Sequence, residues 1–395
     1  MRIAFVTQKV VRHDGQGRLN LVVIEHLLDR GHAVRVVASE LAPELLARPG
    51  LAWSRIPESR LPTQLLKDQA FAWRATRAVA RLRRDVDLVV VNGFVAWPRS
   101  DINVVNFVHA SWLHSTAHPR RQAWDARGLY QTAYTLLNVV LERWTFRRTG
   151  VLVAVSRTVR DELVAIGIDP ARIRIIDNGV DPAEFMPGPP PPEFRGGLGA
   201  GPVALFVGDA RTNRKNLDGV IAALAEVPGV TLLVAGGADG GPFPALAKRL
   251  GLEDRVRFIG HRRDIAEVMR GADIFVFPSR YEPFGLVLLE AAATALPIIT
   301  TRVAGASWLL EDAGIILDDP EDVPQLARAL ARLARDATLR AAMGRNGRAV
   351  AERRSWAATA QSYASLIEET AARGRDRRDP ASARGADKAL DLNLG

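Results

Sequence analysis

The sequence predicts an α/β protein of two domains in tandem, each built on a doubly wound parallel sheet, that face each other across a cleft. Short apolar segments alternate with helical segments twice along the 395 residues, and a segment rich in proline and glycine separates the two series. Such alternation is typical of parallel sheets with helices on both faces. With 48% hydrophobic residues, the chain is long enough to bury two cores of ordinary size.

The composition indicates the cellular compartment and limits the kinds of binding partner that we expect. The absence of cysteine excludes a disulfide framework, and no segment has the length of a signal peptide or a membrane span, so we expect a cytoplasmic protein. Nearly all of the net charge of +9 lies in residues 1–185, which hold 26 Lys and Arg against 18 Asp and Glu. A basic first half suits an anionic lipid surface, nucleic acid or a charged substrate, but a general use of arginine on the surface explains it equally well.

The first domain is expected over residues 1–185, with strands at residues 2–6, 33–38, 87–91, 103–108 and 151–155. An amphipathic helix is predicted over residues 19–30, because Gly31 ends the apolar periodicity. Gly15, Gln16 and Gly17 are predicted to form a turn before this helix. In a doubly wound sheet such a turn faces the ligand crevice at the carboxyl ends of the strands.

Two longer helical segments, residues 64–84 and 120–148, combine arginines with aromatic residues such as Trp73 and Trp144. Such helices rest on a membrane surface in some proteins. Equally, their aromatic faces pack on a sheet while the arginines stay in water. The sequence leaves both readings open.

The second half repeats the alternation. Residues 186–202 hold six prolines and five glycines, so they are predicted to link the domains. The second domain is expected over residues 203–355, with strands at 203–207, 231–235, 256–259, 274–278, 298–300 and 315–317. A last helix is predicted over residues 356–372, and residues 373–395 are charged and poor in apolar residues, so we expect a disordered tail.

The segment at residues 279–297 is the clearest candidate site. It predicts a tight turn and then a buried helix from Phe284, with Pro283 suited to the first turn and Gly285 leaving the free amides open to an anion. Glu282 and Glu290 flank this turn, and eight residues at a helical rise span roughly 12 Å. Two carboxylates around an anion-binding turn suit a nucleotide sugar.

A second candidate element follows the strand at residues 203–207. Gly208 ends this strand, and Arg211, Arg214 and Lys215 follow in a polar loop. A glycine and cations at the carboxyl end of a strand suit a diphosphate, although such a loop taken alone is typical of a solvated surface turn.

Together these residues carry a resemblance to a known family. Gly208, the run from Arg214 to Leu217 and the run from Phe277 to Ala291 closely resemble the second domain of the retaining family 4 glycosyltransferases, also called glycosyl transferases group 1. Gly15 to Gly17 resemble the family's glycine loop, His109 its cleft histidine, and residues 178–181 the signature before its interdomain linker. The resemblance covers residues 1 to about 370 and implies the GT-B fold, in which two Rossmann-like domains face a cleft.

The resemblance implies how a nucleotide-diphosphate sugar is bound as co-substrate. Glu290 would accept hydrogen bonds from the ribose, and Lys215 would neutralise the diphosphate together with the backbone amides of Phe284, Gly285 and Leu286. These groups stabilise the negative charge that develops on the leaving group. No cofactor is implied and no metal is required.

The resemblance also implies the chemistry. Glu282 would lie beside the transferred sugar without acting as a nucleophile, and the leaving phosphate would take the acceptor proton during attack on the same face. His109 would contact a donor hydroxyl or the acceptor, with His114 and His118 as nearby competitors for this role. The acceptor would be a glycan, a lipid-linked saccharide or a small molecule, as in polysaccharide biosynthesis.

One residue departs from the family pattern. The family commonly has an arginine directly after the strand-ending glycine, and this chain has Asp209 there. Because a carboxylate repels a diphosphate, either Arg211 or Arg214 must supply the missing cation, or donor binding is weak.

The basic first half and its aromatic helices permit peripheral association with the inner face of the cytoplasmic membrane. Three other functions stay open. They are an epimerase acting on nucleotide sugars, a non-catalytic nucleotide-sugar-binding scaffold and a nucleic-acid-binding protein. The last has only the charge in its favour, because no recognisable nucleic-acid module is present.

Overall fold

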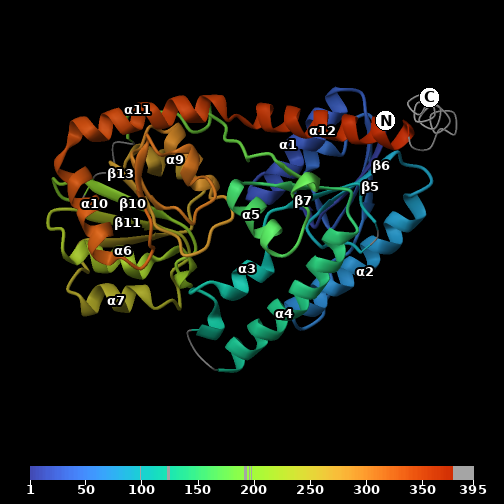
Figure 1. Cartoon of the computed structure of the whole chain (residues 1–395). Helices are drawn as coiled ribbons and strands as arrows, with labels where there is room; N and C mark the ends of the chain where they lie inside the picture. Colours follow the sequence, from blue (N-terminus) through green and yellow to red (C-terminus); the bar gives the residue numbers. More distant parts are fainter. Residues whose placement is uncertain (98, 122–124, 191–193, 195, 197, 377–395) are drawn as a thin grey trace, which may run out of the picture.

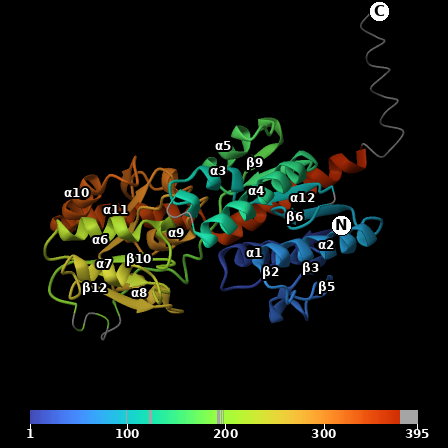
Figure 2. The same ribbon diagram turned by 90° about the horizontal axis from the view of Figure 1, so that it is seen from below.

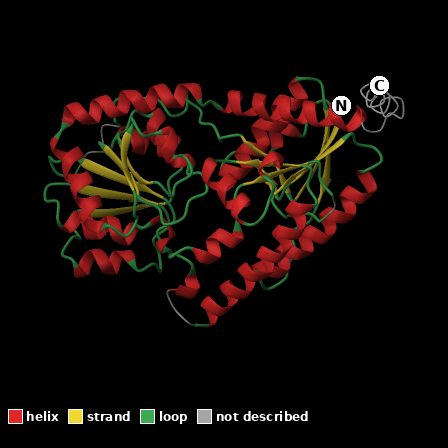
Figure 3. Ribbon diagram, in the orientation of Figure 1, coloured by secondary structure: helices red, strands yellow, loops and turns green. Residues whose placement is uncertain are grey.

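A computed structural model describes residues 1–97, 99–121, 125–190, 194, 196 and 198–376. The chain forms two α/β domains side by side, each with a parallel sheet covered by helices on both faces (Figures 1 and 3). The predicted fold class is therefore confirmed.

The sheet of the first domain has seven strands in the order β5-β3-β1-β6-β7-β8-β9. All of its strand pairs are parallel, and the central strand β1 pairs with β3 on one side and β6 on the other. The strands are β1 (Arg2–Val6), β3 (Ala33–Ala38), β5 (Leu51–Arg55), β6 (Leu88–Asn92), β7 (Ile102–Val105), β8 (Val151–Ala154) and β9 (Ile173–Ile175). A small separate pair joins β2 (Lys9–Val10) to β4 (Glu40–Leu41).

Helices cover both faces of this sheet. The helix α1 (Gly15–Asp29) lies on one face, and α2 (Gln64–Leu82) and α4 (Ala126–Arg147) lie on the other (Figure 1). Two short helices, α3 (His109–His114) and α5 (Arg157–Ala165), lie beside the second domain. Because the sheet is buried on both faces, strands such as β6 are entirely apolar up to Asn92.

The second domain has six parallel strands in the order β12-β11-β10-β13-β14-β15. They are β10 (Val203–Val207), β11 (Thr231–Ala235), β12 (Val256–Gly260), β13 (Ile274–Phe277), β14 (Ile298–Thr301) and β15 (Gly314–Leu317). The helices are α6 (Leu217–Ala225), α7 (Phe243–Arg249), α8 (Ile265–Arg270), α9 (Leu286–Ala293), α10 (Val323–Arg335) and α11 (Ala337–Arg353). Short 3-10 turns complete the fold at Pro43–Leu45, Pro119–Arg121, Pro170–Arg172, Asn213–Lys215 and Ser307–Leu309.

The last helix, α12 (Trp356–Asp376), returns to the first domain and packs against α1 (Figure 1). Glu368 of α12 accepts hydrogen bonds from Arg30 and contacts His32 at 2.9 Å. The helix extends beyond residue 372, the predicted end, and runs at least to Asp376. The rest of the predicted tail, residues 377–395, lies outside the described residues.

Three predicted boundaries are wrong near the cleft. Helix α1 begins at Gly15 because Asp14 caps it, its Oδ1 accepting the Gly17 N–H at 2.6 Å, so the predicted glycine turn is the first turn of the helix. Strand β7 ends at Val105, and His109 begins α3 because its N–H donates to the Glu142 carboxylate instead of to a strand. The predicted helix at residues 120–148 is shorter, since α4 begins at Ala126.

The helix predicted from Phe284 begins at Leu286 instead. Gly285 has a positive φ of 91° and caps α9, so Pro283 and Phe284 lie in the turn before it. Glu282 therefore lies outside the helix, and the separation derived from a helical rise does not apply to the two glutamates.

The two domains contact each other around this turn. The Tyr281 hydroxyl donates to the Val108 carbonyl oxygen at 3.1 Å, and the Ser156 hydroxyl donates to the Pro283 carbonyl oxygen at 2.6 Å. The segment that joins β13 to α9 in the second domain is thus bonded to two residues of the first domain.

Candidate active site

The turn before α9 offers backbone donors to an anion. Gly285 is in the left-handed region, where a side chain would be strained, and an added Cβ would lie 3.2 Å from the Glu282 Cγ. The N–H groups of Gly285, Leu286 and Val287 have no acceptor within the helix, because they precede the first intrahelical bond. This turn therefore combines free donors with the positive end of the α9 dipole.

Lys215 lies beside this turn, at the end of the 3-10 segment that follows β10. Its Nζ lies 3.4 Å from the Glu282 Oε2 and 4.5 Å from the centroid of the Phe277 ring. Gly208 leaves room for the lysine stem, because an added Cβ would lie 2.4 Å from the Lys215 Cδ. Burial lowers the pKa of Lys215, and the Glu282 carboxylate opposes that shift.

The arginines of this loop lie in different places. Arg214 Nη1 lies 3.6 Å from the Glu282 Oε2, so Arg214 joins Lys215 at the same carboxylate. Arg211 instead pairs with Asp209 at 2.8 Å and 3.2 Å, and this pairing lowers the pKa of Asp209. Arg211 therefore neutralises the carboxylate of Asp209, the residue that departs from the family pattern. Arg214 lies beside Lys215 at the Glu282 carboxylate.

Glu290 lies inside α9 and is only partly exposed. Burial raises its pKa to about 7, while the nearby charges of Arg18 and Lys215 favour the ionised form. Within the described part of the chain its carboxylate makes no hydrogen bond or ion pair. A half-buried carboxylate of this kind gains a partner when a ligand hydroxyl binds it.

The glycine segment of the first domain touches the same turn. An added Cβ on Gly15 would lie 2.5 Å from the Leu286 Cδ1, at the start of α9. Gln16 donates to the Asn92 Oδ1 at 2.6 Å, which fixes its side chain. Gly15 therefore meets Leu286 across the cleft, whereas Gly17 is packed against Val11 of its own domain.

His109 is anchored by a buried carboxylate. Its Nδ1 lies 2.6 Å from the Glu142 Oε1, and its Nε2 lies 3.3 Å from the Asn138 Nδ2. The imidazole is flanked by the rings of Phe94 and Phe107, with centroids 5.0 and 4.9 Å away. These contacts leave the ring a single orientation.

His109 lines a cavity of about 290 Å³ between α2, α4 and the carboxyl ends of the strands. Polar and apolar side chains both line it, and the polar ones include Gln8, Gln16, Gln64, Asp68, Asn92 and Tyr134. Of the competing histidines, His114 is exposed, and His118 is buried beside Thr135, where burial lowers its pKa. His109 is thus the histidine placed among groups that suit a polyhydroxylated molecule.

Sequence reasoning missed a set of buried carboxylates under the cleft. Glu142 is buried beneath His109, and burial raises its pKa. Burial also raises the pKa of Glu162 to about 8, and Glu162 lies 3.4 Å from the Tyr281 hydroxyl. No local signal in the sequence indicates Glu142, because the apolar side chains around it in α4, such as Val140 and Trp144, are exposed.

Comparisons with known proteins identify the family. The sequence model described as Glycosyltransferase Family 4 matches residues 13–184, and the one described as Glycosyl transferases group 1 matches residues 195–350. The chain is 32% identical over 411 residues to a D-inositol 3-phosphate glycosyltransferase of Mycobacterium marinum, covering 93% of this chain and 85% of that one. This chain belongs to the family 4 (group 1) glycosyltransferases.

Solved structures agree with this assignment. WaaG, a glycosyltransferase involved in lipopolysaccharide biosynthesis, matches with a TM-score of 0.73 at 25% identity, over 92% of this chain and 99% of that one. Anabaena HepE in complex with UDP-glucose matches in fold with a TM-score of 0.69 at 20% identity, over 93% and 100% of the two chains. The GT-B fold of this glycosyltransferase follows from these relationships.

The described residues contain neither a membrane-spanning helix nor a cluster of metal ligands. None of the described helices has the length and apolarity needed to cross a bilayer. Across the same residues, no three side chains of His, Cys, Asp or Glu are grouped so that they could hold a metal ion.

Proposed function

We propose that this glycosyltransferase transfers a sugar from a nucleotide-diphosphate donor to a polyhydroxylated acceptor with retention of anomeric configuration. The observation that carries the proposal is the pairing of Glu282 with both Lys215 and Arg214, at 3.4 and 3.6 Å. Two cations at this distance stabilise the carboxylate as an anion and weaken it as a nucleophile. Glu282 is therefore assigned to orienting the donor sugar and stabilising positive charge beside it.

The donor is assigned to the second domain. The first turn of α9 together with Lys215 and Arg214 binds the diphosphate, and Glu290 accepts hydrogen bonds from the ribose hydroxyls. These cations and dipoles lie where the leaving phosphate gains negative charge, so they stabilise the transition state more than the bound donor.

The transfer step needs no nucleophile from the enzyme. The bond between the anomeric carbon and the phosphate oxygen breaks, and the acceptor oxygen bonds to the same face of that carbon. The hydroxyl proton of the acceptor passes to the departing phosphate oxygen. His109, held by Glu142, binds a hydroxyl of the donor sugar or the acceptor in the cavity and orients it for this step.

The acceptor is assigned to the cavity beside His109. Its amides and hydroxyls suit a polyol or sugar ring, and a neighbouring hollow of about 270 Å³ shares Gln8, Gln64 and Asp68 with it and adds Lys9, Lys67 and Glu58. A phosphorylated polyol would fit these two adjoining spaces, with its ring in the cavity beside His109 and its phosphate near Lys9 and Lys67. The inositol 3-phosphate named in the relatives is one such molecule.

We also propose that the outer face of α4 associates with an anionic membrane surface, where lipid-linked acceptors would be met. Large apolar side chains that are 40–63% exposed follow one stripe of this helix: Leu129, Leu136, Leu137, Val140 and Trp144. Arg143, Arg147 and Arg148 flank its C-terminal end, and the only carboxylate in α4, Glu142, is buried. Helices α2 and α4 lie on the side of the first domain that faces the viewer in Figure 2.

Co-sedimentation with vesicles tests this surface. We expect wild type to bind vesicles that contain phosphatidylglycerol and not vesicles of phosphatidylcholine alone, and Val140→Glu to weaken binding by about tenfold. Leu250→Glu is the matched control, because Leu250 is similarly exposed but lies in the second domain. A dimer seen by light scattering, with no vesicle binding, would instead assign the stripe to a second copy of the chain.

A donor screen tests the function itself. Labelled UDP-, GDP- and ADP-sugars are incubated with inositol 3-phosphate, free inositol or a membrane extract, and released nucleotide and glycosylated product are measured. We expect acceptor-dependent release of nucleotide from one donor class. Tight donor binding without transfer to any acceptor would favour the non-catalytic scaffold, and a changed sugar still attached to its nucleotide would favour an epimerase.

A further inference from the structure

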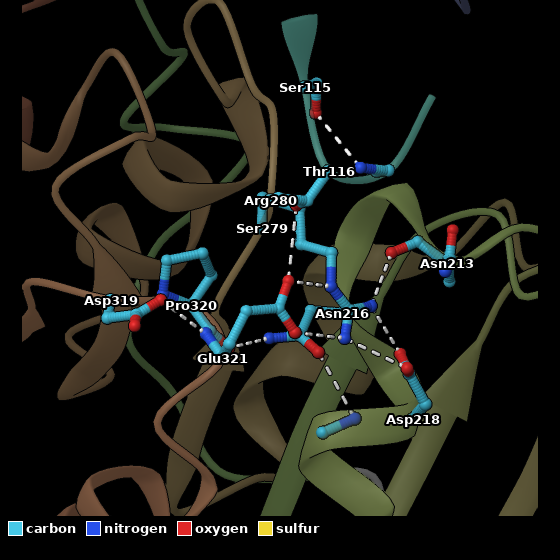
Figure 4. A network of polar contacts seen from close by, with 12 residues as sticks. Ser115, Thr116, Asn213, Asn216, Asp218, Ser279, Arg280, Asp319, Pro320 and Glu321 are labelled. Carbon is cyan, nitrogen blue, oxygen red and sulfur yellow. Dashed lines mark hydrogen bonds and ion pairs between the residues drawn. The ribbon is translucent and has the colours of Figure 1, made fainter. Parts of the chain in front are cut away.

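We propose that Arg280 is a positioning residue that holds Lys215 and Arg214 in place for the donor diphosphate. This inference rests on the proposed donor site. Arg280 precedes Tyr281 and Glu282 in the turn after β13, and its side chain joins a polar network with Asp218 and Glu321 (Figure 4).

The guanidinium of Arg280 uses all five of its N–H donors. Nε and Nη2 donate to the Glu321 carboxylate at 2.7 and 2.9 Å, and Nη1 and Nη2 donate to the Asp218 carboxylate at 2.7 and 3.0 Å. The fifth bond runs from Nη1 to the Asn213 carbonyl oxygen at 2.9 Å. Because the side chain is only 8% exposed, this fork is held in one geometry and largely shielded from water.

Two of the contacts made by Arg280 reach the backbone of the turn that carries the cations. Besides the bond to Asn213, the Arg280 backbone N–H donates to the Arg214 carbonyl oxygen at 2.9 Å. These bonds fix the two residues that immediately precede Lys215. The position of the lysine and of Arg214 beside Glu282 therefore depends on Arg280, although Arg280 itself does not contact Glu282.

The next residue of the turn is fixed by the same network. Asn216 has a positive φ of 62°, and its Nδ2 donates to the Pro320 carbonyl oxygen at 2.5 Å, next to Glu321. Its Oδ1 accepts the Gly219 N–H at 3.2 Å, which caps α6. Lys215 is thus held between the Arg280 bonds on one side and the Asn216 cap on the other.

The charges around Arg280 give a second argument for its positioning role. Arg280 neutralises Asp218 and Glu321, and it lowers the pKa of the Glu321 carboxyl. Without Arg280 these carboxylates would repel each other and attract other cations of the site. Loss of the Arg280 side chain therefore removes the bond to the Asn213 carbonyl oxygen and frees two carboxylates that can compete for Arg214, while the backbone N–H of residue 280 still donates to the Arg214 carbonyl oxygen.

The test compares binding of a diphosphate with binding of the matching nucleoside by calorimetry. The probes are the tightest ligand among UDP, GDP and ADP, and its nucleoside. We expect Arg280→Met to weaken diphosphate binding by about tenfold and nucleoside binding by less than about twofold, since the charge-assisted bonds to phosphate are the ones disturbed. Arg280→Lys keeps the charge but cannot form the fork, so we expect a smaller loss of the same selectivity.

Arg302→Met is the matched control. Arg302 also pairs with two carboxylates of the second domain, Asp318 at 2.9 Å and Glu311 at 3.7 Å, and it contacts no backbone of the Lys215 turn. We expect it to leave both affinities unchanged. Thermal unfolding of each variant shows whether it is folded, and Arg280→Lys decides the question if Arg280→Met does not fold.

A double-mutant comparison separates positioning from general destabilisation. In a chain that carries Lys215→Ala and Arg214→Ala, we expect Arg280→Met to have less than about a threefold further effect on diphosphate binding, because the groups it positions are gone. Equal weakening of nucleoside and diphosphate, unchanged affinities, or a full additional effect in that background would overturn the inference. If Lys215→Ala leaves diphosphate affinity unchanged, it is the proposed donor site that fails.

Discussion

Replacing Lys215 by alanine is the sharpest perturbation of the donor site. Its Nζ lies 3.4 Å from the Glu282 Oε2 and its side chain is only 15% exposed, so the charge acts in a partly desolvated place. A hydrogen bond to a charged group contributes about 1.5–3 kcal/mol. Because Glu282 already uses part of this charge, we take about 2 kcal/mol, which corresponds to a roughly thirtyfold rise in the Kd for the donor.

Lys215→Met separates charge from packing. Methionine keeps the stem that fills the space beside Gly208 and the Phe277 ring, whereas alanine empties it. We expect both variants to lose similar donor affinity in isothermal titration calorimetry. Only the alanine variant should also lower the thermal unfolding temperature. Changes in Kd below about threefold in both variants would refute the assignment of Lys215 to the diphosphate.

Three further predictions concern burial and pH. Burial raises the pKa of Glu290 to about 7, so we expect donor affinity to rise as the pH rises through that value, and Glu290→Gln to lower affinity about tenfold and abolish the pH dependence in calorimetry. Glu162 is neutral at pH 7 because burial raises its pKa to about 8, so the folded state binds its proton more tightly than the unfolded state does. Its contribution to the free energy of unfolding should fall as the pH rises from about 4.5 to 8, and Glu162→Gln should remove that fall in urea denaturation, so that the variant matches wild type below about pH 4.5 and is more stable at pH 7. Tyr281→Phe removes the bond to the Val108 carbonyl oxygen across the cleft, and we expect urea denaturation to show a loss of about 1 kcal/mol.

The sequence was informative where one local segment carries both the fold and the chemistry. Gly285 follows Glu282 within one turn, so local rules for glycine and for helix termini predict an anion-binding turn there. Lys215 could be predicted because it closely follows a strand whose carboxyl end must face the cleft. The exact start of α9 was missed because Gly285 caps the helix at a positive φ, whereas proline rules placed Pro283 inside it.

The sequence was uninformative where partners lie far apart along the chain. Glu142 anchors His109 from 33 residues away, and Arg280 bonds Asp218 and Glu321 at separations of 62 and 41 residues. No local pattern indicates such pairs. The sequence also could not decide whether Arg211 or Arg214 replaces the arginine missing at Asp209. The structure pairs Asp209 with Arg211 and places Arg214 beside Glu282.

The configuration of the first-formed product tests the central proposal most directly. Once a donor and acceptor pair is found, proton NMR of the anomeric signal during the first turnovers compares the product with the donor. Transfer on the same face, with Glu282 held by Lys215 and Arg214, predicts a product with the anomeric configuration of the donor. A product of the opposite configuration would contradict this account and would point to a base, such as His109, activating the acceptor for attack from the other face.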